Sequence, residues 1–414
     1  MAQLIDIKEQ IERFVLVTVA VSDNDDTVES IDELEELAST AGALTVGKVI
    51  QNREKAHPGT YIGKGKIEEV KLLAEELNAT GVVCDDELSP TQLRNLEEAL
   101  QMKVLDRTVI ILDIFAKRAS TKEGKIQVEL AQLKYRSSRL IGLRNSLSRL
   151  GGGIGTRGPG EKKLEMDRRL IKERINQLRQ ELSEVVQNRE TSRSLRSKNM
   201  IPVVAIVGYT NAGKSTLLNH LTNAGVLVEN KLFATLDPTT RNLALESGQE
   251  ILLTDTVGFI RKLPHHLIDS FRSTLEEAKH SDIILHVVDS SNPDVYKQMH
   301  IVYETLNNLG IQDKVIITAF NKQDKLEVEQ ILKDLKADYT VKISAKTGNG
   351  IDKLLELVEK VLNERKILVE RVFSYQEAGK IQTIRKYGQL LEEEYQQDGI
   401  YVKAYVTVEI YQTL

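Results

Sequence analysis

The amino-terminal part of the chain alternates between short apolar runs and segments with helical spacing. Residues 14–21 (FVLVTVAV) and 81–84 (GVVC) are apolar and β-branched, which predicts buried strands. Residues 31–41 and 64–77 place apolar side chains three and four positions apart, as amphipathic helices do. We therefore expect a small α/β domain at 1–116.

Two long helical patterns follow, with a glycine-rich break between them. The break at 151–160 (GGGIGTRGPG) disfavours helix, because glycine carries a high backbone entropy cost and Pro159 lacks an amide donor. Two apolar stripes joined by a short loop would bury each other, so an antiparallel helical hairpin is predicted at 117–198, with polar residues 188–199 resembling a linker. The stripes are Ile126, Leu130, Leu133, Leu140, Leu143, Leu147 and Leu150, then Leu164, Ile171, Ile175, Leu178, Leu182 and Val185.

Five strand-like runs then alternate with helical patterns, which is typical of a doubly wound, mostly parallel sheet. This domain is predicted at 199–364. Alternation at 400–410, after a charged helical stretch, predicts a small α+β domain at 365–414. A chain of 414 residues is too long for one core, so the expected fold class is multidomain α/β. The five runs are 203–207, 251–254, 283–288, 314–319 and 340–343.

Charge is distributed unevenly along a chain of ordinary composition. The sequence is 41% hydrophobic and 28% charged, with a formal net charge of -5, as in soluble globular proteins. Residues 117–174 nevertheless hold 16 Lys and Arg against 6 Asp and Glu, so a basic hairpin on an acidic body favours a polyanionic partner. With one cysteine, Cys84, no apolar run long enough to cross a bilayer and no secretory signal, we expect a cytoplasmic protein without membrane insertion.

The segment after the apolar run VVAIV fits the phosphate-binding pattern GxxxxGK[ST] and leads into a helical pattern. Glycines let backbone amides converge on the β-phosphate, Lys214 places a cation between the β- and γ-phosphates, and the Ser215 hydroxyl can ligate Mg²⁺. A chance glycine loop is the alternative, but strand, loop and helix occur in the required order. The predicted phosphate-binding residues are Gly208, Tyr209, Thr210, Asn211, Ala212, Gly213, Lys214, Ser215 and Thr216.

An NKxD string after the strand-like VIITAF predicts guanine selectivity. Asp324 would accept hydrogen bonds from guanine N1 and the exocyclic amino group, whereas adenine offers neither donor there. ATP would leave that carboxylate without partners, and Ala345 is placed to donate its amide to guanine O6. A solvated helix start is the alternative for the string alone. The predicted base-binding residues are Asn321, Lys322, Gln323, Asp324, Ser344, Ala345 and Lys346.

Two further segments are expected to respond to the third phosphate. Asp255 ends the strand-like ILLT, where it can hold Mg²⁺ through water, and the Gly258 amide can meet the γ-phosphate. The segment FATLDPTT should supply a threonine to the Mg²⁺ shell, and Thr235, Thr239 and Thr240 are equal candidates on the pattern alone. Loss of the γ-phosphate would release these segments. The residues assigned to them are Phe233, Ala234, Thr235, Leu236, Asp237, Asp255, Thr256, Val257 and Gly258.

Two positions bear on the rate of hydrolysis. Phe259 follows Gly258 where many small GTPases carry a glutamine that orients water, and a phenyl ring cannot do this. Intrinsic hydrolysis should therefore be slow and accelerated by a partner or a cation. Asn211 makes K⁺ a candidate cation, since similar loops in potassium-dependent GTPases use an asparagine there. An asparagine that only stabilises the loop is the alternative.

The motifs GYTNAGKS, FATLDPTTR, DTVGF and NKQD, with RLGGGIGTRGPGE and HPGTYIGKGK at 57–66, closely resemble the HflX family of ribosome-associated GTPases, in the TRAFAC class and the Obg-HflX-like superfamily. The resemblance covers nearly the whole chain. It implies Mg²⁺-dependent hydrolysis of GTP to GDP and phosphate, slow alone and stimulated by the ribosome. It also selects Thr235 as the switch threonine, with Lys214, Thr235 and Gly258 as catalytic residues and Ser215 and Thr235 as Mg²⁺ ligands.

The resemblance further implies binding to 23S rRNA and proteins of the large (50S) ribosomal subunit, and splitting of stalled ribosomes under stress by a protein that is monomeric off the ribosome. Some family members protect ribosomes from antibiotics at the peptidyl transferase centre, which the hairpin loop reaches. This chain reads GPGEKKLE where relatives often read GPGETQLE. The alternatives are a large-subunit assembly or storage factor, a GTPase with an unrelated partner, and, for the hairpin, a solvated basic coiled coil. The predicted rRNA-contacting residues are Arg149, Gly151, Gly152, Gly153, Arg157, Gly158, Pro159, Lys162 and Lys163.

Overall fold

The computed structural model divides into two compact units. The first unit comprises 1–185, 229–237 and 260–272, and the second comprises 186–228, 238–259 and 273–414. Among the described residues, no helix has the length and apolar character needed to traverse a membrane. The structure describes residues 11–21, 26–150, 159–198, 201–222, 231–237, 239–264, 267, 277–328, 331–364, 366–406 and 408–414, without side chains at 141–150, 159–164, 188–198, 386, 408 and 409.

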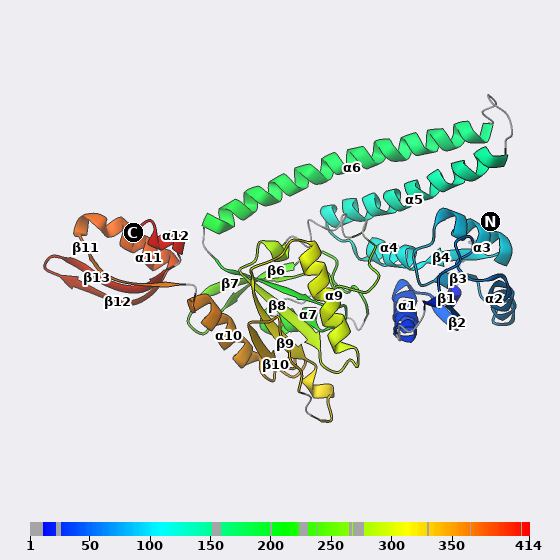
Figure 1. Cartoon of the computed structure of the whole chain (residues 1–414). Helices are drawn as coiled ribbons and strands as arrows, with labels where there is room; N and C mark the ends of the chain where they lie inside the picture. Colours follow the sequence, from blue (N-terminus) through cyan, green and yellow to red (C-terminus); the bar gives the residue numbers. More distant parts are fainter. Residues whose placement is uncertain are drawn as a thin grey trace, which may run out of the picture. The chain divides into compact units, whose positions relative to one another are not determined.

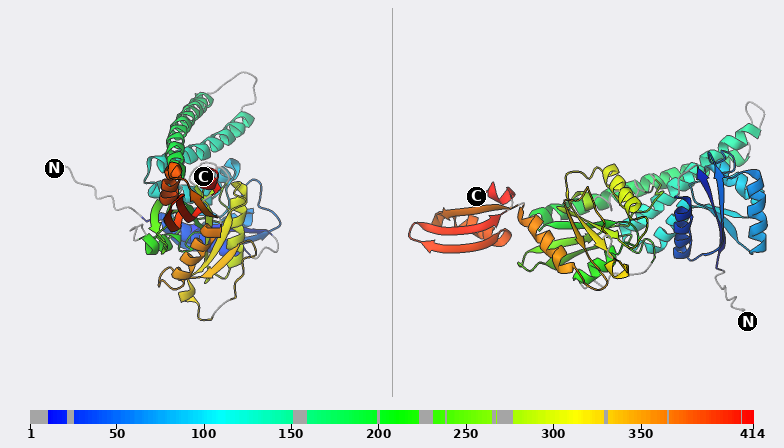
Figure 2. Two further views of the ribbon diagram at one scale, coloured as in Figure 1. Left: turned by 90° about the vertical axis from the view of Figure 1, so that its left-hand side faces the viewer. Right: turned by 60° about the horizontal axis from the view of Figure 1, so that its bottom comes forward.

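The first unit starts with a parallel sheet of order β2-β1-β3-β4 (Figure 1). The central strand β1 is apolar on both faces because helices cover both (Figure 2). Val15 and Val17 of β1 pack with Val70 of α2 and Leu96 of α3, while α1 and α4 contact each other. The elements are β1 (Arg13–Val21), α1 (Thr27–Ala41), β2 (Leu44–Arg53), α2 (Lys64–Glu76), β3 (Gly81–Cys84), α3 (Pro90–Leu100), β4 (Lys103–Asp106) and α4 (Arg107–Arg118).

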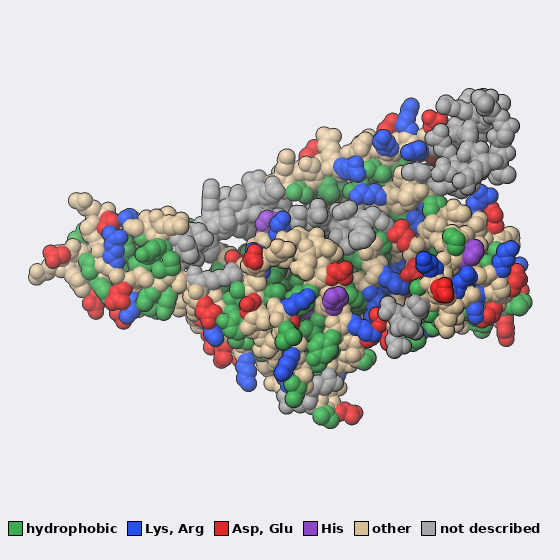
Figure 3. All heavy atoms as spheres, viewed as in Figure 1, with side chains coloured by type: hydrophobic (Ala, Val, Ile, Leu, Met, Phe, Trp, Pro, Cys, Tyr) green, Lys and Arg blue, Asp and Glu red, His purple; other side chains and the backbone are tan. Residues whose placement is uncertain are grey.

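Two long antiparallel helices, α5 (Lys122–Leu150) and α6 (Pro159–Lys198), form the predicted hairpin (Figure 1). Where side chains are described, their apolar stripes meet as expected, and an ion pair between Arg174 and Glu129 at 2.8 Å adds to the contact. The buried contacts of the stripes join Ile126, Leu130, Ile175 and Leu178. Lys and Arg side chains follow the outer surface of the hairpin (Figure 3), and the exposed ones described there include Arg136, Arg168, Arg169, Lys172 and Arg179.

The second unit contains a six-stranded sheet of order β10-β9-β8-β5-β7-β6, parallel except for β6. Helices α7 and α10 cover one face and α9 the other, so the central strands are buried on both sides. The carboxyl ends of the parallel strands lie at one edge, which brings the sequence motifs together. The elements are β5 (Val203–Gly208), α7 (Lys214–Thr222), β6 (Thr239–Ala244), β7 (Glu250–Asp255), β8 (Ile283–Asp289), α9 (Val295–Asn308), β9 (Val315–Asn321), η1 (Gln323–Lys325), β10 (Tyr339–Lys342) and α10 (Ile351–Glu364).

A three-stranded antiparallel sheet of order β11-β13-β12 with its own core follows in the second unit. Val402 and Ala404 of the central strand pack on Phe373, Ile381 and Ile384. This agrees with the predicted α+β character of the carboxyl-terminal residues. The elements are β11 (Ile367–Phe373), η2 (Tyr375–Glu377), α11 (Ala378–Tyr387), β12 (Gln389–Gln396), β13 (Gly399–Val406) and α12 (Val408–Tyr411).

Two details of the sequence interpretation are wrong. Residues 188–198 are not an irregular linker, because α6 continues to Lys198. The segment is polar but contains neither glycine nor proline, and polarity alone does not end a helix. The strand expected at 400–410 ends at Val406, and α12 follows. The boundaries of the four domains proposed from the sequence stay a prediction.

Candidate nucleotide-binding site

The predicted phosphate loop connects β5 to α7 in the second unit. Gly213 has φ +98°, and a Cβ atom there would collide with the side-chain amide of Asn321. The Lys214 ammonium is buried and donates to the carbonyls of Gly208 at 3.2 Å and Tyr209 at 2.8 Å. Burial, together with Lys322, lowers the pKa of Lys214 to about 8 against the opposing charge of Asp255. A phosphate group would compensate this buried cation.

The residues expected beside Mg²⁺ are close together at the ends of β7 and the phosphate loop. The Ser215 hydroxyl donates to Asp255 Oδ2 at 2.8 Å, and Asp255 is buried. Two oxygen ligands of the kind that Mg²⁺ prefers therefore meet at one point. A Cβ on Gly258 would lie 2.9 Å from Thr210 Cα and 3.0 Å from Lys214 Nζ, so only glycine admits this approach of the loop after β7.

Phe259 ties the loop after β7 to the phosphate loop through its backbone. Its carbonyl accepts from the Thr210 amide at 2.7 Å, and its amide donates to the Gly208 carbonyl at 3.1 Å. Its ring is buried. The side chain is thus a packing group, in line with the expectation that it does not orient water.

Asn321 joins the base-recognition segments to the phosphate loop. Its side-chain amide donates to the Ala212 carbonyl at 2.8 Å, and its Oδ1 accepts from the Ala345 amide at 2.9 Å. The Ser344 hydroxyl donates to Asp324 Oδ1 at 2.6 Å, which orients a carboxylate that is otherwise exposed. The sequence patterns from three strand ends therefore converge on one surface.

A partner of this segment was missed in the sequence. Lys322, which has a left-handed φ of 64°, pairs with Asp289 at 2.7 Å. Gln323 donates to the Ser290 hydroxyl at 3.0 Å. Asp289 ends β8, which neighbours β9, so an acidic residue at the end of an apolar strand was the available signal.

Residues 231–237, which contain the predicted switch threonine, belong to the first unit. Phe233 is buried and meets the ring of Phe115 edge to face, with centroids 4.7 Å apart. Thr235 is half-buried, and Leu236 is buried. Asp237 is hydrogen-bonded to Ser120 and Thr121. Contacts of Phe233, Ala234, Thr235, Leu236 and Asp237 with nucleotide or Mg²⁺ stay predictions.

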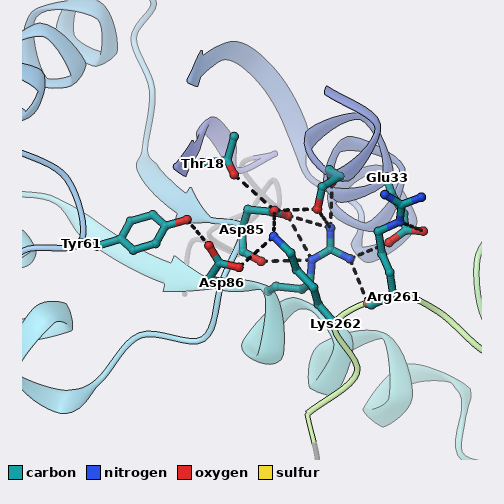
Figure 4. A network of polar contacts seen from close by, with 9 residues as sticks. Thr18, Glu33, Tyr61, Asp85, Asp86, Arg261 and Lys262 are labelled. Carbon is teal, nitrogen blue, oxygen red and sulfur yellow. Dashed lines mark hydrogen bonds and ion pairs between the residues drawn. The ribbon is translucent and has the colours of Figure 1, made fainter. Parts of the chain in front are cut away.

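Residues 260–264, which continue from Phe259, also belong to the first unit and join a buried ion-pair network (Figure 4). Lys262 bonds to Asp85 and lies 2.8 Å from Asp86. Arg107, only 1% exposed, pairs with Asp85 at 2.7 Å and Glu33 at 2.6 Å, and also donates to the Arg261 carbonyl at 3.3 Å. The sequence pattern gave no sign of this network.

The residues predicted to contact rRNA fall largely outside the described part of the chain. Gly151, Gly152, Gly153, Arg157 and Gly158 lie outside the described residues. Pro159 begins α6, and the side chains of Arg149, Lys162 and Lys163 are among those not described. Their contacts with rRNA stay predictions.

Three consecutive segments of the chain match models of known protein families. Family models described as the N-terminal region and the middle region of a GTP-binding GTPase match residues 28–116 and 118–196, and one described as a 50S ribosome-binding GTPase matches 203–322. A GTPase HflX of Lacrimispora saccharolytica is 67% identical, covering 100% of this chain and 98% of its own. The GTPase HflX of Caldanaerobacter subterraneus is 51% identical over 97% of this chain and 93% of its own. A GTP-binding protein from Sulfolobus solfataricus in complex with GDP has 25% identity and a TM-score of 0.45, covering 86% of this chain and 99% of its own.

Proposed function

Because the chain belongs to the HflX GTPase family, we propose that it hydrolyses GTP and uses the presence of the third phosphate to control its binding to the large ribosomal subunit. The nucleotide part of this proposal rests on the Asn321 side chain, which is hydrogen-bonded to both the Ala212 carbonyl and the Ala345 amide. One side chain fixes the distance between the phosphate loop and the base-recognition segments. A bound nucleotide would therefore contact the phosphate loop with its phosphates and the base-recognition segments with its base at the same time.

Guanine is selected by Asp324. The hydrogen bond from Ser344 holds one carboxylate oxygen, and the carboxylate remains at the surface where a purine can reach it. A base with two donors on adjacent positions satisfies the carboxylate, whereas adenine presents a lone pair at N1 and no amino group at C2. The backbone amide of Ala345 is already bonded to Asn321, so its predicted second contact with guanine O6 would be shared.

The residues present fit Mg²⁺. Ser215 and Asp255 supply a hydroxyl and a carboxylate that already meet at 2.8 Å, and Thr235 is the proposed third protein group. When bound, the ion would neutralise charge on the phosphate oxygens. Lys214 holds its cation against the loop carbonyls until phosphate oxygens replace them. Ser215→Ala should raise the Mg²⁺ concentration needed for half-maximal hydrolysis, and an unchanged requirement would exclude this ligand.

K⁺ is proposed as a second ion beside the phosphate loop. Asn211 is exposed and has a left-handed φ of 60°, which asparagine adopts more readily than most residues. Hydrolysis by the isolated protein should be faster in KCl than in NaCl at equal ionic strength. Equal rates in the two salts would remove this part of the proposal and leave Asn211 as a loop-forming residue.

Slow intrinsic hydrolysis is proposed because Phe259 occupies the position after Gly258 and its ring is buried. A partner would then supply the group that orients the attacking water, and the ribosome is the proposed partner. A fast turnover by the isolated protein in any salt would contradict this.

The hairpin is the proposed contact with the large subunit. Its described helices expose Arg168, Arg169 and Lys172, and cations of this kind neutralise RNA phosphates. The glycine-rich loop at the tip would reach the peptidyl transferase centre, and we place ribosome splitting and any antibiotic protection there. In the GTP state the protein would dock and force the subunits apart, and hydrolysis would permit release.

Sucrose gradients of intact ribosomes test this proposal. With a non-hydrolysable GTP analogue, the protein should reduce the intact-ribosome peak and sediment with the large subunit. Arg157→Glu with Lys163→Glu should abolish this effect and spare nucleotide binding. The control Lys64→Glu with Lys353→Glu makes the same charge change at two exposed sites in α2 and α10. Binding without loss of the intact peak would instead indicate an assembly or storage factor.

A further inference from the structure

Asp237 caps the hairpin helix α5 from a distant part of the chain. Its Oδ2 accepts from the Ser120 amide at 2.8 Å, the Thr121 amide at 2.9 Å and the Ser120 hydroxyl at 2.7 Å. Its Oδ1 accepts from the Thr121 hydroxyl at 2.6 Å. Helix α5 begins at the next residue, Lys122. The first amides of a helix lack partners within the helix, so a carboxylate placed there is stabilising.

The Thr121 hydroxyl links this carboxylate to the first turn of α5. It accepts from the Gly124 amide at 2.9 Å while it donates to Asp237. Charge-assisted hydrogen bonds of this kind are stronger than neutral ones. Displacement of Asp237 would therefore leave the Ser120 and Thr121 amides without this acceptor, and it would also disturb the hydrogen bond from the Gly124 amide to the Thr121 hydroxyl.

The fit at this point requires glycine at position 124. A Cβ on Gly124 would overlap Asp237 Oδ1 and would lie 3.2 Å from Asp237 Cγ. Glycine is otherwise a poor helix former compared with alanine. The missing side chain at this position makes room for the carboxylate from residues 231–237.

The segment that carries Asp237 is also the one that carries the proposed switch threonine. Two residues of extended chain span at most about 7 Å, so Asp237 cannot be independent of Thr235. On the other side of Thr235, Phe233 is fixed against Phe115 of α4, with the two rings at 85° to each other. Thr235 is thus held between two attachments to the corner where α4 leads into α5.

We propose that Asp237 is a positioning residue that couples the nucleotide state to the hairpin by making or releasing this cap on α5. The inference rests on the proposed function in one respect, namely that Thr235 responds to the third phosphate. Because the chain between Thr235 and Asp237 is short, a displacement of Thr235 by the γ-phosphate would pull on Asp237. Helix α5 is the first arm of the hairpin, so the arm proposed to touch rRNA is attached directly to the nucleotide sensor.

Hydrogen exchange measured by mass spectrometry on the full chain tests the coupling. A peptide that spans residues 117–126 contains the Ser120 and Thr121 amides. Its exchange rate should differ about tenfold between the complexes with GDP and with a non-hydrolysable GTP analogue, which is the effect expected for a helix cap made in one state only. Equal exchange in the two complexes would overturn the inference, because a purely structural cap does not depend on the nucleotide.

Gly124→Ala is the decisive variant because it displaces the Asp237 carboxylate from the cap without replacing any residue that is predicted to contact the nucleotide. It should make the exchange of 117–126 alike in the two complexes, although alanine favours helix formation. Gly65→Ala is the matched control, in the first turn of α2 with nothing within 4 Å of its Cβ position, and it should keep the difference. A nucleotide-dependent difference that survives in Gly124→Ala would overturn the proposal.

Asp237→Asn gives a second readout from the other side of the contact. An amide group offers one acceptor oxygen where the carboxylate offers two, so it should reduce the nucleotide-dependent difference, and retention of the full difference would count against the proposal. Binding of GDP and the analogue is measured on the same samples. If both nucleotides bind but exchange is equal, only the coupling fails. If neither binds, the proposed function fails first.

Discussion

Arg107 should be essential to the stability of the amino-terminal sheet, and its replacement by methionine gives a prediction with a definite size. The guanidinium is 1% exposed and donates to Asp85, Glu33 and the carbonyls of Ser30 and Arg261. Methionine fills much of the same space but leaves Asp85, which is fully buried, without its main counter-ion. Breaking one side of a buried ion pair costs about 3–5 kcal/mol. Lys262 still bonds to Asp85, so we expect about 3 kcal/mol.

The single cysteine reports on this region without interference from the rest of the chain. Cys84 is buried at the end of β3, next to Asp85, and burial raises the pKa of its thiol well above the usual range. It reacts with a thiol reagent only when the sheet opens, so its labelling rate follows the population of the open state. A loss of about 3 kcal/mol should accelerate labelling in Arg107→Met by roughly a hundredfold, since 1.36 kcal/mol is a factor of ten.

Two further variants decide whether the ion pair is the cause. Asp85→Asn combined with Arg107→Met should label more slowly than Arg107→Met alone, because the buried charge is then gone. Arg94→Met removes a partly exposed arginine that pairs with Glu98 and should change the labelling rate less than about threefold. Labelling of Arg107→Met at the wild-type rate, or a double variant that labels faster than the single one, would refute the reasoning.

Further predictions concern the nucleotide pocket and the same network. Gly213→Ala should weaken GDP binding at least tenfold or so by calorimetry, because its Cβ meets Asn321, whereas Gly248→Ala, with a similar φ of +81° and open space, should not. Burial would raise the pKa of Asp85, but Arg107 and Lys262 outweigh it and hold the pKa at about 2. The stability that ionised Asp85 provides is therefore present above pH 3.8, and about 2 kcal/mol of it is lost as the pH falls towards 2. Cleavage of the first unit by pepsin should accelerate more between pH 3.8 and 2 in the wild-type protein than in Asp85→Asn, which lacks this titrating group.

Sequence patterns were sufficient wherever the information is local. The phosphate loop, the segment after β7 and the base-recognition string each follow directly from one strand, and the parallel sheet brings the strand ends to one edge. The apolar stripes of the hairpin were likewise readable, because Ile126 and Leu130 meet Ile175 and Leu178 through simple periodicity.

Side-chain partners that are distant in sequence could not be predicted in this way. Asp85 and Lys262 are separated by 177 positions, and neither belongs to a motif. Asp237 was assigned to the nucleotide from its neighbours, yet its carboxylate is bonded to residues 120 and 121. Short elements with mixed polarity, such as β12 and β6, were also missed, since their exposed faces give no clear alternation.

Competition binding of GDP, ADP and xanthosine diphosphate to the full chain and to Asp324→Asn tests the central claim most directly. The wild-type protein should prefer GDP over ADP by about a hundredfold or more, since the Asp324 carboxylate finds both donors only on guanine. In Asp324→Asn the affinity for GDP should fall and that for xanthosine diphosphate should rise, because the asparagine amide can donate to the C2 oxygen of xanthine while its oxygen still accepts from N1. A folded wild-type protein that binds GDP and ADP equally well would contradict the account.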